Sequence, residues 1–520
     1  MAPTLSSAFH GFFPCIFLVV ATAAAATPFL SCTQAPHPEL CTAMVGSSGF
    51  TGENSNSSLR DIAIRATISK AVLAHRLASA ADLAGLDAVT KAAWADCLEL
   101  CEDTITKLNY SLNSPDCSQE DSQTWLSAAL ANQQTCRNGF VELNSSFPFP
   151  SSPFLSHNIS NAVSNLLAIN KAATPASTSG SGSRKLLSDG FPSWVSTVDR
   201  KLLQSSSVNA DIVVAKDGSG NYETISQALA AAAKLRKGSS RFVIRVKAGV
   251  YRENVEVTKT MKNLMIIGDG MSSTIVTGDK NVVDGSTTFR SATFAVVGDG
   301  FIARDISFQN TAGPEKHQAV ALRSGSDLSV FYRCGFKGYQ DTLYVHSQRQ
   351  FYRNCDISGT VDFIFGDAVV VFQNCNIYCR RPRSGQKNTV TAQGRTDPNE
   401  NTGISIHNSV VAASGDLSGV KSYLGRPWKQ YSRTVFMKTN IGRLIDPAGW
   451  LEWDGSFALN TLYYGEYMNT GAGASTAGRV KWEGYRVITS ASEAGKFTVG
   501  RFLSGDSWIP ATGVPYTSGL

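Results

Sequence analysis

The chain has 520 residues, of which 42% are hydrophobic and 17% are charged, with 44 glycines and 18 prolines. This length exceeds one ordinary domain, and the apolar content excludes a disordered protein, so we expect two or three folded units. Beyond residue 26 no run of 18 apolar residues occurs, which excludes a membrane-embedded body. Residues 204–520 carry a net charge of +9 and residues 1–203 carry −3. The basic half predicts an acidic partner, and the acidic first half could mask the basic half.

The amino terminus has the pattern of a secretory signal peptide. Residues 12–26 are apolar and end in small residues, although no Lys or Arg precedes them. We expect residues 1–26 to be removed and the protein to be secreted; the alternative, a membrane anchor, needs a longer apolar span. Ten of the eleven cysteines remain, an even number that fits an oxidising compartment. Four glycosylation sequons also fit this route: Asn56, Asn109, Asn144 and Asn158.

Residues 27–175 are predicted to form a helical bundle. Four segments between positions 58 and 172 repeat apolar residues every three or four positions and contain little Gly or Pro. Nothing in them suggests catalysis, so we expect a structural or inhibitory module. Residues 176–204 follow as a linker in which Arg-Lys-Leu-Leu occurs twice, at 184–187 and at 200–203. A repeated basic tetrapeptide between two domains predicts proteolytic processing.

Residues 205–520 consist of short predicted strands with an internal period. The segment around Cys334 returns around Cys355 and again around Cys375, at steps of 21 and 20 residues. A strand motif that recurs every 20-odd residues without intervening helices is typical of a parallel β-helix. A β-sandwich is the alternative, but its strands recur every 8–12 residues or so and do not copy one another.

Two aspartates occupy equivalent positions of this repeat. Asp341 follows Cys334 by seven residues and Asp362 follows Cys355 by seven, so we expect them on adjacent coils, roughly 4.8 Å apart. Repulsion between neighbouring carboxylates raises the proton affinity of one of them, and one protonated plus one ionised carboxyl suits acid/base and nucleophilic chemistry. Aligned aspartates can instead cap backbone amides or bind calcium, so the periodicity alone leaves both interpretations open.

Five motifs make the second half recognisable. They occupy residues 249–253, 318–323, 339–344, 359–366 and 423–428. In this order they resemble the motifs of plant pectinesterases (pectin methylesterases) that carry an inhibitor-like pro-region. The resemblance implies an all-β right-handed parallel β-helix catalytic domain over residues 205–520, preceded by an all-α four-helix bundle similar to pectinesterase inhibitors. The implied activity is hydrolysis of galacturonate methyl esters in pectin, with release of methanol.

The resemblance implies a role for each matched polar residue. Asp362 is expected to attack the ester carbonyl, and Asp341 to protonate the departing methanol and then activate water. Gln318 and Gln340 are expected to stabilise the oxyanion, and Arg426 to orient Asp362 and keep it ionised. Gln340 and Asp341 are neighbours, so they can share a site only if the turn bends between them. No cofactor and no metal are expected.

The resemblance also suggests which side chains contact the substrate. Thr288 and Trp428 are expected there, and Phe365 is a further candidate. Trp450 and Trp453 are weaker candidates for the groove, because packing in the core is the alternative role of each aromatic. The expected substrate-binding residues are Thr288, Gln318, Phe365, Arg426 and Trp428.

Disulfide candidates lie in both halves of the chain. In the helical segment, the candidates that match the inhibitor-like pattern are Cys32, Cys41, Cys97 and Cys136. Cys101 and Cys117 go beyond that pattern. In the second half, Cys355 is one coil from both Cys334 and Cys375, and either spacing could suit a bridge.

The expected partners follow from the resemblance and the linker. They are methyl-esterified homogalacturonan in the plant cell wall, a processing protease at the Arg-Lys-Leu-Leu sites and proteinaceous pectinesterase inhibitors; nucleic acid and, after signal removal, membranes are not expected. A polygalacturonase or pectate lyase is an alternative, but no calcium-binding or lyase motif is present. A non-catalytic pectin-binding wall protein is another alternative, although it needs no aligned aspartates. A serine esterase is disfavoured because no G-x-S-x-G pattern occurs.

Overall fold

The computed structural model describes five stretches of the chain. They are residues 31–46, 58–114, 117–145, 157–172 and 209–520. The expected signal peptide, both Arg-Lys-Leu-Leu tetrapeptides and the sequon at Asn56 lie outside these stretches and stay predictions. Within the described stretches, no helix combines the length and apolar character that a membrane span requires.

The first four stretches form the helical bundle that the apolar periodicity predicts. Its helices are η1 (Cys32–Gln34), α1 (Pro38–Gly46), α2 (Leu59–Ser79), α3 (Ala88–Asn113), α4 (Gln119–Glu142) and α5 (His157–Ala172). Helices α2, α3 and α4 each begin at a polar residue whose side chain accepts a hydrogen bond from a free backbone N–H of the first turn. These residues are Ser58, Asp87 and Ser118. These caps fix where the three helices begin.

Two disulfides join the cysteines that match the inhibitor-like pattern. Cys32 pairs with Cys41, and Cys97 of α3 pairs with Cys136 of α4. Cys101, the additional cysteine of α3, is a buried free thiol. The bridge between Cys97 and Cys136 therefore ties two of the long helices, α3 and α4, together. Cys117 is also free.

Three of the four sequon asparagines lie in the described part of the bundle. Asn144 and Asn158 are exposed, and Asn109 is partly exposed. The side-chain amide of Asn109 donates a hydrogen bond to the carbonyl of Ile105 inside α3. Glycosylation at these positions stays a prediction.

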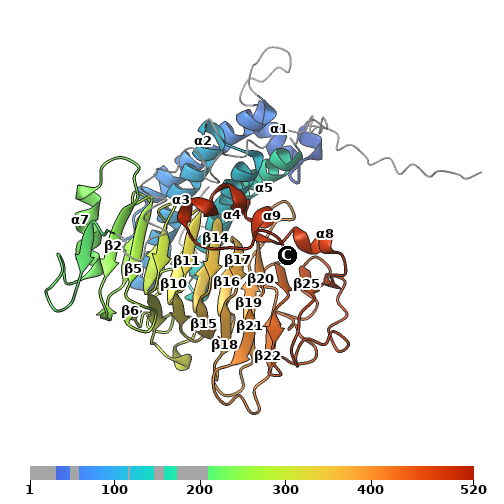
Figure 1. Ribbon diagram of the computed structural model, residues 1–520. Helices are drawn as coiled ribbons and strands as arrows, with labels where there is room; N and C mark the ends of the chain where they lie inside the picture. The colour runs from blue at the N-terminus through green and yellow to red at the C-terminus, as the bar shows by residue number, and fades with distance from the viewer. Residues whose placement is uncertain (1–30, 47–57, 115–116, 146–156, 173–208) are drawn as a thin grey trace, which may run out of the picture.

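Residues 209–520 form a parallel β-helix of three sheets, as the sequence period predicts (Figure 1). Sheet A contains β1 (Ile212–Val214), β2 (Phe242–Val246), β5 (Leu264–Gly268), β8 (Ile302–Arg304), β11 (Ser329–Tyr332), β14 (Arg349–Arg353), β17 (Val369–Gln373), β20 (Gly403–His407), β23 (Arg433–Met437), β25 (Tyr463–Tyr467) and β26 (Tyr485–Val487). Sheet B contains β3 (Gly249–Arg252), β6 (Thr274–Gly278), β9 (Ser307–Asn310), β12 (Gly335–Lys337), β15 (Asp356–Gly359), β18 (Asn376–Cys379), β21 (Val410–Ala413) and β24 (Asn440–Ile441). Sheet C contains β4 (Val255–Val257), β7 (Phe294–Val296), β10 (Leu322–Ser324), β13 (Leu343–Val345), β16 (Ile364–Gly366), β19 (Asn388–Gln393) and β22 (Ser422–Gly425).

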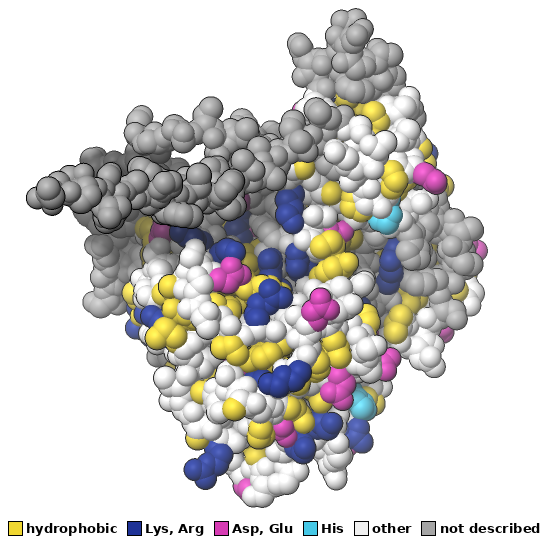
Figure 2. All heavy atoms as spheres, turned by 90° about the vertical axis from the view of Figure 1, so that its right-hand side faces the viewer, with side chains coloured by type: hydrophobic (Ala, Val, Ile, Leu, Met, Phe, Trp, Pro, Cys, Tyr) yellow, Lys and Arg dark blue, Asp and Glu magenta, His cyan; other side chains and the backbone are white. Residues whose placement is uncertain are grey.

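Short helices complete the β-helix. They are α7 (Ile225–Leu235), η2 (Pro314–Lys316), α8 (Ala491–Gly495), α9 (Val499–Phe502), η3 (Gly505–Ser507) and η4 (Ile509–Thr512). Helix α7 contributes its buried face to the main core next to β1 and β2, and α9 packs on β17. Figure 1 shows the bundle, coloured blue to cyan, lying along one side of the β-helix. Figure 2 shows Lys and Arg side chains spread over the end of the β-helix that the viewer faces.

The register between coils follows the repeated cysteines. Phe331 of β11 pairs with Tyr352 of β14, and Tyr352 pairs with Phe372 of β17. The three rings stack inside the β-helix, with centroids 4.6 Å apart at each step. Because side chains alternate between the two faces of a strand, a shift of one residue would turn these rings outward. Burial of the stacked rings therefore fixes the register of the coils.

Each of these coils turns from sheet A into sheet B through a residue in the left-handed backbone region. With φ of 48° to 56°, these residues are Asp305, Arg333, Asn354, Asn374, Asn408 and Lys438. Asn and Asp tolerate this conformation better than other residues with a side chain, because their short polar groups can hydrogen bond locally. The Asn residues that precede Cys355 and Cys375 in the sequence thus mark the turns.

The expected bridge between Cys355 and either Cys334 or Cys375 is wrong. All three are buried free thiols, as is Cys379. On adjacent coils, equivalent side chains point the same way, so their Cβ atoms keep the coil spacing of roughly 4.8 Å, whereas a disulfide needs about 3.8 Å. The thiols instead donate to backbone carbonyls; the Sγ of Cys355 lies 3.3 Å from the carbonyl oxygen of Phe331.

Trp450 packs in the core, so its expected place in the substrate groove is wrong. Its side chain is 1% exposed and stacks on Tyr464 with ring centroids 4.2 Å apart. The indole N–H donates to Glu466 over 3.2 Å, and the same carboxylate pairs with buried Arg479. The nitrogen of the ring therefore has its partner inside the protein, which is the usual condition for burying a tryptophan.

The free thiols give a direct test of the fold. Residues 205–520 contain four cysteines, all of them unbridged in the structure. A chain of these residues, denatured without reductant, should therefore release four equivalents of chromophore from a thiol reagent. Prior reduction should not increase this number. A value of two that rises to four after reduction would show that a bridge forms between stacked coils.

Candidate active site

Two aspartates lie at the corner where sheet B passes into sheet C. Asp341 precedes β13 and Asp362 precedes β16, and these strands pair through Leu343 and Ile364. This pairing places the aspartates one coil apart, as the sequence repeat predicts. Both have left-handed backbones, with φ of 61° and 52°, and both are buried. The corner thus directs two carboxyl groups to one place.

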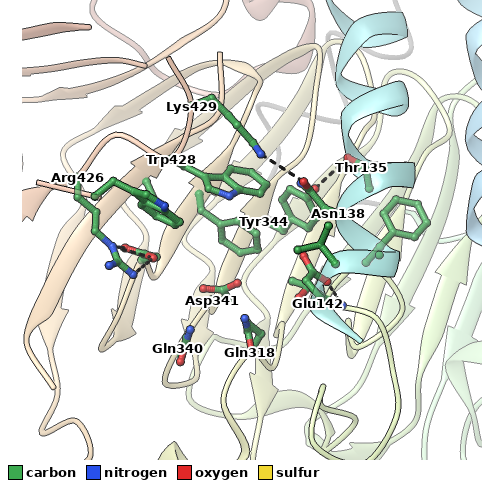
Figure 3. A pocket seen from close by; sticks show the side chains of 18 residues that line it. Thr135, Asn138, Glu142, Gln318, Gln340, Asp341, Tyr344, Arg426, Trp428 and Lys429 are labelled. Atoms are coloured by element: carbon green, nitrogen blue, oxygen red, sulfur yellow. Dashed lines mark hydrogen bonds and ion pairs between the residues drawn. The ribbon is translucent and has the colours of Figure 1, made fainter. Parts of the chain in front are cut away.

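The left-handed turn at Asp341 also brings Gln340 into the site. Side chains of neighbours in a regular strand point to opposite faces, but Gln340 and Asp341 line one cavity of about 460 Å³, together with Gln318 and Asp362. In Figure 3 the amides of Gln318 and Gln340 lie side by side next to Asp341. Within the described residues neither amide has a hydrogen-bond partner, so both can donate to a ligand.

Asp362 is held by a bidentate ion pair with Arg426. The Nε of Arg426 lies 2.8 Å from Oδ1 and its Nη2 lies 2.6 Å from Oδ2. Burial disfavours the charge of Arg426, but Asp362 outweighs this effect and raises the pKa of the guanidinium. The other face of Arg426 packs on Trp453, whose ring centroid lies 4.3 Å from the guanidinium carbon. The planar guanidinium is held by Asp362 and by Trp453, so it keeps the Asp362 carboxylate in one orientation.

Asp341 has a different environment from Asp362. No cation of the described residues lies within ion-pair distance of it. Burial raises the pKa of Asp341 well above its usual value, and the nearby carboxyls of Asp362 and Glu142 add to the increase. Asp341 therefore keeps its proton at pH values where an ordinary aspartate is ionised. One corner thus holds an acid next to a paired carboxylate, an arrangement that separates two roles.

An aromatic wall borders the carboxyl groups. Tyr344 of β13 stacks on Phe365 of β16, with ring centroids 4.2 Å apart, and the edge of Phe365 meets Trp428 at 5.9 Å. Trp428 lies against Gly394, where an added Cβ would come within 2.9 Å of the indole. A glycine is therefore required for this position of Trp428. Trp453 also lines the cavity, so the structure brings the expected aromatics together, apart from the buried Trp450.

Helix α4 of the bundle closes the cavity. Thr135, Asn138 and Glu142 all line it (Figure 3). The Glu142 carboxyl accepts a hydrogen bond from the backbone N–H of Thr288 over 3.1 Å. Burial raises the pKa of Glu142. Thr288 thus lies in the cavity, as expected, but in this structure its neighbour is a side chain of the bundle.

Charges of opposite sign meet across the rest of the interface. Arg290 of the β-helix lies 2.5 Å from Asp96 of α3 and also pairs with Glu99. Asp121 of α4 lies 2.5 Å from Arg349. These contacts agree with the expectation that an acidic first half masks part of a basic second half.

Three residues of the site were not predicted from the sequence. Tyr344 lies within a recognised motif, so its position was available although no role was assigned. Thr389 donates a hydrogen bond to Asp362, but it follows Asp362 by 27 residues, because the loop between β18 and β19 lengthens this coil. Glu142 enters from the other part of the chain, and no pattern in the sequence points to it.

Within the described residues, no group of three or more His, Cys, Asp or Glu side chains is arranged to hold a metal ion. At the corner, the cavity is lined by the amides of Gln318 and Gln340, the carboxyl groups of Asp341 and Asp362 and the guanidinium of Arg426. Such a set can bind an ester, donate to an oxyanion and transfer protons.

Comparisons with known proteins agree with this chemistry. A pectinesterase family model matches residues 211–506, and a plant invertase/pectin methylesterase inhibitor model matches residues 30–169. Pectinesterase 2 of Citrus sinensis is 61% identical over 435 residues, which are 83% of this chain and 82% of that protein. Probable pectinesterase/pectinesterase inhibitor 17 of Arabidopsis thaliana is 56% identical over 498 residues, 94% of each chain.

Solved structures of pectin methylesterases resemble the β-helix. The carrot enzyme is 64% identical, with a TM-score of 0.60, and the match covers 61% of this chain and 100% of the carrot chain. The Aspergillus niger enzyme is 32% identical, with a TM-score of 0.50, covering 59% and 97%. The match covers the whole carrot chain, so that structure consists of a β-helix part alone. This chain belongs to the pectinesterase family, whose reaction is hydrolysis of methyl esters in pectin.

The charged interface predicts how tightly the two parts bind. Arg290→Ala should weaken binding of a separate bundle (residues 27–175) to the β-helix (residues 205–520) by on the order of 30-fold or more, because Asp96 would stay buried without its partner. Calorimetric titration measures this change. Arg381→Ala removes an exposed pair with Asp416 inside the β-helix part and should leave affinity unchanged. An unaltered dissociation constant for Arg290→Ala would contradict the electrostatic account.

Proposed function

We propose that this pectinesterase cleaves galacturonate methyl esters with Asp362 as nucleophile and Asp341 as acid and base. The observation that carries the proposal is the pairing of environments at one corner: Asp362 in a bidentate ion pair with Arg426, and Asp341 with a raised pKa beside it. An anion can attack and a neutral acid can donate a proton, so the two groups supply complementary steps.

In the first half-reaction, a carboxylate oxygen of Asp362 attacks the carbonyl carbon of the ester. The carbonyl oxygen becomes negative and accepts hydrogen bonds from the amides of Gln318 and Gln340, which have no competing partner among the described residues. The bond to the methoxy group then breaks, and Asp341 gives its proton to the methoxy oxygen. Methanol leaves, and the galacturonyl group stays on Asp362 as an anhydride.

In the second half-reaction, Asp341 acts as the base. Its carboxylate removes a proton from water while the water oxygen attacks the galacturonyl carbon. The same amides donate hydrogen bonds to the second oxyanion. The bond to Asp362 breaks, which restores the Asp362 carboxylate and leaves Asp341 protonated for the next cycle. The product is galacturonic acid within the polymer, which ionises in water.

The aromatic wall supplies the surface for the sugar rings. Phe365 and Trp428 present carbon-rich faces, to which the apolar faces of a polysaccharide can pack. Trp453 holds the guanidinium of Arg426, so it links the groove to the nucleophile. Thr288 offers its backbone N–H, which Glu142 occupies here, to a polar group of the substrate.

We infer that the uncut chain is a precursor whose groove is covered. Helix α4 covers the cavity that contains Asp341 and Asp362, so we expect that polymer cannot enter while the bundle stays. Cleavage by a protease at residues 184–187 or 200–203, in the linker, would separate the parts. Secretion through the signal at residues 1–26 and action in the plant cell wall complete this proposal.

Substitutions at the corner test the assignment of roles. In a chain of residues 205–520, Asp362→Asn should abolish methanol release from methylated pectin, because an amide cannot attack the ester. Asp341→Asn should remove nearly all turnover, since methanol then leaves without a proton and no base activates water. Gln318→Ala should lose less, on the order of 100-fold, as expected for one oxyanion donor.

The order of these effects matters more than their sizes. Circular dichroism and melting temperature serve to show that each variant is folded. Gln373→Ala, on sheet A outside the cavity, is a matched control that should keep its activity. Substantial demethylation by Asp362→Asn would mean that Asp362 is not the nucleophile.

A comparison of cut and uncut chains tests the precursor proposal. Residues 27–520 with Arg184, Lys185, Arg200 and Lys201 all changed to Ala should stay uncut and release methanol far more slowly than residues 205–520, because α4 blocks the groove. The matched control is the same chain with the natural linker after treatment with wall extract. Full activity of the uncut variant would contradict the proposal.

A further inference from the structure

The hydroxyl of Thr389 makes two hydrogen bonds to one residue, Asp362. It donates to Oδ1 of Asp362 over 2.6 Å and accepts from the backbone N–H of Asp362 over 2.8 Å. Thr389 belongs to β19, where Thr391 pairs with Ile364 of β16, so Thr389 is the equivalent of Asp362 on the next coil. Its side chain is 1% exposed. These contacts lie inside the protein, where water does not compete.

The backbone N–H of Asp362 needs the Thr389 hydroxyl as its hydrogen-bond partner. The N–H of the equivalent Asp341 donates to the carbonyl of Val361 on the adjacent coil, as the ladder requires. Asp362 has a similar left-handed backbone, with φ of 52°, but its N–H donates to the Thr389 hydroxyl instead. An unpaired buried N–H is unfavourable, so one hydroxyl stabilises both the turn and the carboxylate.

The hydrogen bonds of the carboxylate distinguish its two oxygens. Oδ1 accepts from Thr389 and from the Nε of Arg426 at 2.8 Å, which occupies both of its lone pairs. Oδ2 accepts a short bond from the Nη2 of Arg426 at 2.6 Å and a longer one, at 3.2 Å, from the Nε that Oδ1 binds more closely. Because this shared Nε bond is the weaker of the two, Oδ2 has the less engaged lone pair to offer to an incoming carbonyl carbon.

We propose that Thr389 is a positioning residue that fixes the rotamer of Asp362 and leaves Oδ2 as the attacking atom. The inference rests on the proposed role of Asp362 as nucleophile. If Arg426 were its only partner, the carboxylate of Asp362 could rotate together with the guanidinium and stay paired. The additional bond from Thr389 to Oδ1 restricts this motion, and small errors in position are costly for attack.

The test compares variants at two threonines of β19 in a chain of residues 205–520. Thr389→Val keeps the shape and removes the hydroxyl; it should lower kcat on methylated pectin on the order of 10- to 100-fold, as expected for one hydrogen bond to a charged group, with KM within about twofold. Thr389→Ser restores the hydroxyl and should recover most of kcat. Thr391→Val is the matched control, because its hydroxyl donates to the backbone carbonyl of Leu424 instead.

The pH profile separates positioning of the nucleophile from a purely structural role. Loss of a hydrogen bond to a carboxylate disfavours its ionised form, so the acid limb of kcat/KM should move to higher pH in Thr389→Val and not in Thr391→Val. If Thr389→Val does not fold, Thr389→Cys, which keeps the volume and donates weakly, should show the same changes at smaller size.

Distinct outcomes overturn the inference and the proposed function. Wild-type kcat and an unmoved acid limb in folded Thr389→Val or Thr389→Cys would overturn the role of Thr389 alone. A lower kcat with an unmoved limb and no recovery in Thr389→Ser would also overturn it, because only packing would then be involved. Activity that survives Asp362→Asn would instead overturn the function on which the inference rests.

Discussion

The site depends on one constraint, the placement of two carboxyl groups on adjacent coils of the β-helix. The ladder that pairs β13 with β16 fixes Asp341 and Asp362 in register, and their left-handed turns direct both into one cavity. Two buried anions at this separation repel each other strongly. Arg426 balances one of them, and the proton of Asp341 removes the other charge. The proposed acid and the proposed nucleophile therefore differ because burial and the neighbouring charge of Asp362 act on Asp341, whereas Arg426 pairs with Asp362.

The bundle adds a second constraint, because the surface that must open to a polymer is also an apolar surface. Tyr344, Phe365 and Trp428 belong to the same hydrophobic cluster as the interior of the bundle. In the uncut chain these rings gain from burial against α4. In the separated β-helix they become the walls of the groove. Ion pairs such as that of Arg290 with Asp96 give the contact its orientation, which an apolar surface alone does not specify.

The sequence predicts most of the fold because its strongest signals are local or periodic. The cysteine-marked repeat predicts the register that brings Asp341 and Asp362 together, and the apolar periodicity predicts helices α2 to α5. The repeat fails for Thr389, because the longer coil after Asp362 changes the spacing to 27 residues. It also suggests a disulfide at Cys355. This disulfide does not form, because equivalent side chains on adjacent coils point the same way and stay too far apart. Glu142 reaches the cavity through packing of two separate parts, which no local pattern records.

If the bundle is cleaved off as proposed, its departure changes the charge of the groove as well as its shape. In the covered cavity Lys429 donates to Asn138 of α4 over 3.2 Å. Burial lowers the pKa of Lys429 to about 8, against the opposing effect of Glu142. When α4 leaves, water reaches the ammonium group and its pKa returns toward the usual higher range, so Lys429 is a full cation at neutral pH. The same step removes the Glu142 carboxyl. The opened groove is thus more positive than the covered one, which suits a polymer that gains carboxylates as the reaction proceeds.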